Sequence, residues 1–134
     1  MFLVFLNPKL KDNFLELCVH AALANGVFAE QQMRAFEAYC KELEVEPYIP
    51  VAKNSLDELY KKILENSSVV ERNIIIVELL SFIISDGDID NDEREMLDKL
   101  SSVLGVTKEK LENFIGQVTR YRDLAQEIFT SIVK

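Results

Sequence analysis

The most distinctive group of reactive side chains in this sequence is a run of carboxylates between residues 86 and 98. This stretch contains seven acidic residues and one arginine, so most of the chain's net charge of -8 is concentrated here. Carboxylate oxygens at alternate positions of a turn can converge on a hard cation such as Ca²⁺ or Mg²⁺, which prefers oxygen ligands. We therefore expect Asp86, Asp88, Asp90 and Glu93 to form a weak site for Ca²⁺ or Mg²⁺.

The spacing of these carboxylates matches only half of an EF-hand loop. With Gly87 at the sixth loop position, Glu93 falls at the twelfth, but the first and third ligand positions are Phe82 and Ile84. A second interpretation needs no ion, because Asp90 can cap the following helix and acidic residues favour its first turn. A third is a docking surface for a basic partner. The sequence is compatible with all three interpretations of the acidic run.

The other residues that could do chemistry are one histidine and two cysteines. His20 lies two residues after Cys18, which on a helix separates the two side chains by about 200° and prevents a dyad. Cys18 and Cys40 both lie on apolar stripes, so we expect reduced, buried thiols. No nucleophile and base can be paired, no phosphate-binding loop is visible, and zinc would lack ligands. The protein is therefore expected not to be an enzyme.

The elements that position these residues are predicted to be helices, because apolar residues recur at helical spacing along the chain. Capping-box patterns begin at Ser55 and Ser68. The run 74–84 is apolar nearly all round, which predicts a buried central helix, with a buried strand as the competing interpretation. Its single charge, Glu78, is expected either to reach the narrow polar strip of the helix or to pair with a basic residue such as Arg120 or Arg122.

The end of the chain is expected to form two further helical stretches. The first is capped by Thr107, the two are separated at Gly116, and the second carries a last apolar stripe over 121–132.

Two parts of the sequence share a pattern when the chain is shifted by 61 positions. The shift places Asn25 on Asp86, Leu43 on Leu104, and Val45 on Val106. Each part contains a helix, a short loop with glycine, and a second helix. We therefore predict an all-α, single-domain helical bundle over residues 1–134, built from two pseudo-repeated helical hairpins at about 10–46 and 68–107.

The second of these turns resembles a known family signature. Residues 85–94, followed by Leu97, Leu100 and the Leu104-Gly105-Val106 ending, are similar to the repeated pattern of the TerB-like (tellurite resistance protein B-like) family. The resemblance implies an all-helical domain with a bacterial, cytoplasmic accessory role in stress or defence, as in tellurite resistance, and metal binding in some members. In the first repeat, Asn25 and Gln32 replace the family's acidic residues, which halves the charge available to a site built from both turns.

Composition excludes several other classes of protein. A pI near 4.7 disfavours nucleic acid, and the longest apolar run, 74–84, is too short to insert into a membrane. No secretory signal is visible, so a cytoplasmic location is expected.

The expected function is a non-enzymatic TerB-like interaction or regulatory module with a protein partner. The alternative is a structural or oligomerising helical protein without a ligand, in which the apolar residues 1–6 contribute to a homodimer.

Overall fold

The computed structural model describes residues 1–24, 30–48 and 51–134, and all regular secondary structure in these ranges is helical. The prediction of an all-α fold is therefore confirmed. Asn25, which the shift of 61 places on Asp86, lies outside the described residues, and so does the side chain of Asp86. The α-helices are α1 (Lys11–Leu23), α2 (Glu30–Glu42), α3 (Leu56–Asn66), α4 (Val69–Ile83), α5 (Asn91–Leu104) and α6 (Lys108–Val133). The described ranges also contain the short 3-10 helices η1 (Leu3–Phe5), η2 (Pro8–Leu10) and η3 (Ile84–Asp86).

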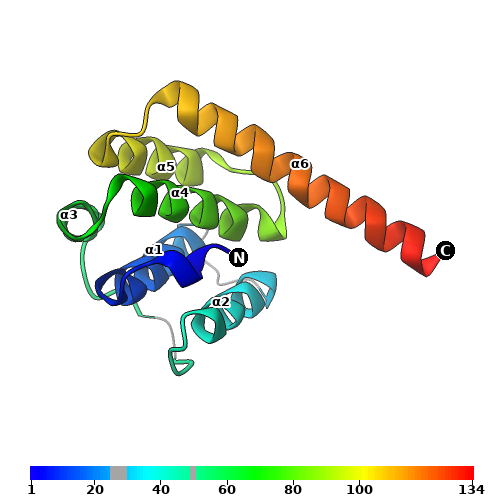
Figure 1. The fold of residues 1–134 in the computed structure, drawn as a ribbon, viewed down its shortest axis with the longest axis horizontal. Coiled ribbons are helices and arrows are strands. Elements are labelled where there is room, and N and C mark those ends of the chain that lie inside the picture. The colour runs from blue at the N-terminus through cyan, green and yellow to red at the C-terminus, as the bar shows by residue number, and fades with distance from the viewer. Residues whose placement is uncertain (25–29, 49–50) are drawn as a thin grey trace.

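Helix α4 lies at the centre of the bundle and packs against α1, α2, α5 and α6 (Figure 1). Its residues Ile75, Leu79 and Phe82 are fully buried. A helix with neighbours on several sides can bury apolar residues around most of its circumference. The prediction of a buried central helix is confirmed, and the alternative of a strand is wrong.

The starts of the helices follow from local sequence. Complete capping boxes begin α3 at Ser55, α4 at Ser68 and α5 at Asp90, and the Thr107 side chain caps α6. In each case a side-chain oxygen satisfies a backbone N–H that has no partner within the helix.

The ends of α2 and α5 are built alike. The N–H of Val45 donates to the carbonyl of Cys40 at 2.8 Å, and that of Val106 donates to Ser101 at 2.9 Å. Each bond closes a turn through a left-handed residue, Glu44 with φ 58° and Gly105 with φ 74°. These pairs are 61 positions apart, as the predicted repeat requires, while the equivalence of the complete halves stays a prediction.

Helix α6 differs from its prediction. It runs without a break through Gly116, because one glycine in a helix costs only about 1 kcal/mol and leaves the hydrogen bonds intact. The first half of α6 packs on α4 and α5, and the second half extends beyond the bundle to the C-terminus (Figure 1).

Candidate functional site

The predicted cation-binding residues lie where the chain passes from α4 to α5. The Asp90 side chain accepts the N–H of Glu93 at 2.8 Å, and Oε1 of Glu93 accepts the N–H of Asp90 at 3.1 Å. Glu93 is only 1% exposed. The structure therefore brings these two predicted ligands together as a helix cap, with both carboxylates engaged by the backbone.

Asp88, the next predicted ligand, points into solvent and is 99% exposed. Its Oδ1 lies 3.8 Å from Nη2 of Arg122, and Nη1 of Arg122 donates to the carbonyl of Gly87 at 3.3 Å. Arg122 thus connects the acidic turn to α6. Among the side chains that the structure describes, no three His, Cys, Asp or Glu residues come close enough together to hold a metal ion.

An apolar pocket of about 590 Å³ lies between the N-terminus, α2, α4 and α6. This volume is within the roughly 300–1,000 Å³ range of small-molecule sites. Its apolar and aromatic lining includes the side chains of Met1, Phe2, Tyr39, Phe114, Val118 and Tyr121. No sequence motif indicated this pocket, because residues far apart in the chain form it.

Glu78 is the acidic residue in the wall of this pocket and is 3% exposed. The expected pairing with an arginine is wrong. The Glu78 carboxylate instead accepts the N–H of Phe2 at 3.2 Å and lies 3.6 Å from the amino group of Met1, which also contacts Glu42 at 2.6 Å. Burial raises the pKa of Glu78, and the Phe2 N–H and the nearby ammonium group partly oppose this rise.

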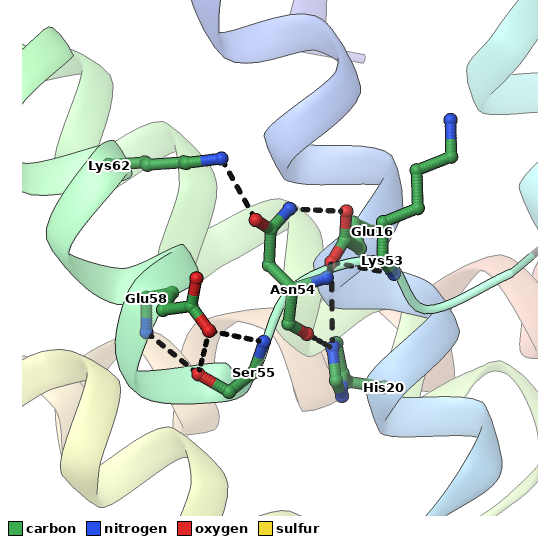
Figure 2. Close-up of polar contacts among 7 residues, drawn as sticks. All are labelled: Glu16, His20, Lys53, Asn54, Ser55, Glu58 and Lys62. Atoms are coloured by element: carbon green, nitrogen blue, oxygen red, sulfur yellow. Dashed lines mark hydrogen bonds and ion pairs between the residues drawn. The ribbon is translucent and has the colours of Figure 1, made fainter.

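The histidine belongs to a polar cluster that fastens the segment before α3 to α1 (Figure 2). Glu16 accepts the N–H of Lys53 at 3.2 Å, and from Asn54 it accepts the N–H at 2.6 Å and the side-chain amide at 3.0 Å. His20 Nε2 donates to the carbonyl of Asn54 at 2.9 Å. The Ser55 hydroxyl donates to Glu58 instead of facing the histidine. The hydrogen bonds of this cluster hold the segment before α3 against α1.

The distal half of α6 exposes an apolar face. The exposed fractions there range from 51% for Ile128 to 73% for Ile132. The sequence predicted this stripe but gave no sign that the rest of the chain would leave it uncovered. The six exposed large side chains of this face are Tyr121, Leu124, Ile128, Phe129, Ile132 and Val133.

No protein-family model, curated protein or solved structure matches this chain. Within residues 1–24, 30–48 and 51–134, no helix has both the length and the apolar character needed to cross a membrane.

Proposed function

We propose that the protein is a non-enzymatic interaction module that binds a protein partner through the distal half of α6. The observation that carries this proposal is the exposure of its apolar side chains, among them Phe129 at 57%. Soluble proteins rarely expose a contiguous apolar patch of several hundred Å² unless it serves an interaction. The resemblance to the TerB-like family supports a regulatory role in bacterial stress or defence, in the cytoplasm.

The pocket beside Glu78 extends the proposed binding face. Tyr121 belongs to both, because it lines the pocket and begins the exposed face of α6. A partner that covers the helix would therefore meet an apolar cavity at one end of its contact. Large apolar side chains that fill such cavities contribute much of the affinity of protein interfaces.

Affinity capture from native cell extract tests this proposal. The bait would be the full chain, the Ile128→Asp variant, and Thr130→Asp as a matched control. Residues 128 and 130 are about 200° apart on the helix, so the control adds the same charge on the opposite face. Retention of a defined protein by the wild type and by Thr130→Asp, but not by Ile128→Asp, supports the proposal. Equal retention by all three refutes it.

We also propose that the acidic turn binds Ca²⁺ or Mg²⁺ weakly and that this binding regulates the interaction. Support comes from Arg122, which contacts Asp88 and Gly87 from α6. A bound cation would compete with Arg122 for the oxygens of the turn and so alter the start of the binding face.

Thermal unfolding with and without millimolar cation tests this second proposal. Asp86→Asn combined with Asp90→Asn should remove any cation-induced rise in melting temperature, while asparagine at position 90 still caps α5. A melting temperature that does not change with cation leaves the turn with its capping role alone. A protein that then also fails the capture experiment would fit the structural alternative, which has no ligand.

A further inference from the structure

Helix α6 carries one continuous apolar seam whose two halves have different surroundings. Its positions alternate in spacings of three and four, which is the pattern of a helix that packs along a partner helix. In the proximal half, Leu111 is 1% exposed and Val118 is 9% exposed, because α4 and α5 cover them. In the distal half the same seam continues in phase but is uncovered. The seam positions are Leu111, Phe114, Val118, Tyr121, Ala125, Ile128 and Ile132.

The distal part of the seam is symmetric about its own midpoint. Tyr121, Ala125, Ile128 and Ile132 are separated by four, three and four positions, so the spacing is the same in both chain directions. Two copies of this segment in antiparallel orientation would place Tyr121 opposite Ile132 and Ala125 opposite Ile128. A small side chain would then face a large one in both central layers, which favours close packing.

We propose that the distal half of α6 pairs antiparallel with the same segment of a second copy and forms a two-fold symmetric homodimer. The inference rests on the proposed function, since it identifies the partner of the same face. A two-fold axis requires a self-complementary surface, and the palindromic spacing provides one.

The exposed area is close to what a stable dimer needs. If a fully exposed aromatic or large aliphatic side chain offers about 200 Å², the exposed side chains on or beside the seam present roughly 600 Å². This sum leaves out Val133, which lies about 110° from the centre of the seam. A standard interface buries about 800 Å² on each partner. Polar atoms at the rim, including the Arg122 side chain, can supply the remainder. None of the four central positions of the seam is charged, so closing the interface desolvates no ion at its core.

Light scattering after size-exclusion chromatography tests the dimer with the full chain. We expect a dimer at concentrations on the order of 100 µM, corresponding to a micromolar or tighter dissociation constant. Ile128→Glu should give a monomer with unchanged helical circular dichroism. The Ile128 side chain is 51% exposed in a single copy, so its replacement should leave the fold of the chain intact. Thr130→Glu, on the opposite face, should remain a dimer. A monomeric wild type, or a dimeric Ile128→Glu, overturns the proposal.

A charge exchange tests the antiparallel register. Ala125→Glu and Ile128→Lys should each be monomeric alone, because each would place two charges against apolar side chains. Mixed in equal amounts, the two variants should form a heterodimer. The introduced carboxylate of one chain would then face the introduced ammonium group of the other in one layer, and the second layer would remain native. Failure to recover a dimer in the mixture refutes this register.

The dimer and the proposed function can fail separately. A monomeric wild type that still captures another protein in an Ile128-dependent manner would refute the second copy while supporting the proposed function. A dimer that forms through the seam and captures no other protein would support the second copy as the partner of this face.

Discussion

Replacing Glu16 with alanine should destabilise the protein by about 3–4 kcal/mol. Glu16 is 7% exposed, and its carboxylate accepts three N–H groups from Lys53 and Asn54 at 2.6–3.2 Å (Figure 2). A hydrogen bond to a charged group contributes about 1.5–3 kcal/mol. Water at this partly exposed loop can satisfy some of the donors in the variant, so the total should be smaller than three independent bonds.

Glu16→Gln refines the prediction. One amide oxygen can still accept the two backbone donors, while its NH₂ group would face the side-chain amide of Asn54, so a loss of about 1 kcal/mol is expected. Rotation of the Asn54 amide could relieve this clash of donors, but it would break the hydrogen bond that Asn54 Oδ1 accepts from Lys62 at 2.9 Å.

Urea unfolding followed by circular dichroism measures both losses. Glu65→Ala is a suitable control, because Glu65 is 58% exposed and pairs with Lys61 at 4.0 Å. An exposed pair of this kind contributes at most about 0.5 kcal/mol. A loss below about 1 kcal/mol for Glu16→Ala, or equal losses for the alanine and glutamine variants, would show that the cluster does not hold the loop.

Three further predictions concern the acidic turn, the pocket and the helix ends. In urea titrations, Asp90→Ala should cost about 1–2 kcal/mol and Asp90→Asn less than about 0.5 kcal/mol, since asparagine caps equally well. Burial raises the pKa of Glu78, so the native state keeps this proton to a higher pH than the unfolded chain does. The free energy of unfolding should therefore fall as the pH rises from the ordinary pKa of 4.5 through the folded pKa. Urea titrations at several pH values measure this slope, and Glu78→Gln should remove it. At the left-handed positions, Gly105→Ala should lower the free energy of unfolding by about 1 kcal/mol, and Glu44→Gly should raise it by a similar amount. Thermal unfolding measures both changes, and a loss of stability in both variants would contradict the backbone explanation.

Features that depend on neighbouring residues in the sequence could be predicted. The capping boxes at Ser55 and Ser68 each involve residues three positions apart, so the sequence contains all the information that they need. Asp90 was predicted as either a ligand or a cap, and it does cap α5. Glu93 was predicted as a ligand or as an acidic residue of the first turn, and it completes the capping box with Asp90. The central helix was predictable because its apolar circumference requires neighbours on several sides.

Features that depend on how helices pack could not be predicted in the same way. The partners of Glu78 are the first two residues of the chain, more than seventy positions away, and nothing in the local sequence relates them. The apolar pocket has the same origin, since its walls come from the N-terminus and three helices. For Glu78, the sequence indicated a buried charge that needed compensation but not the groups that provide it.

The length of α6 explains why its seam has two different surroundings. At 1.5 Å per residue, its 26 residues span about 39 Å, whereas the 15 residues of α4 span about 22 Å. The α5 helix, which covers the other side of the proximal half, is shorter still at 14 residues. Because α4 and α5 pack on the proximal half of α6, helices of these lengths leave its distal side chains exposed in a single copy. Since the seam nevertheless continues in phase through Ile132, its burial requires a helix from outside the bundle, and the overhanging segment of a second copy has the matching length and the matching spacing.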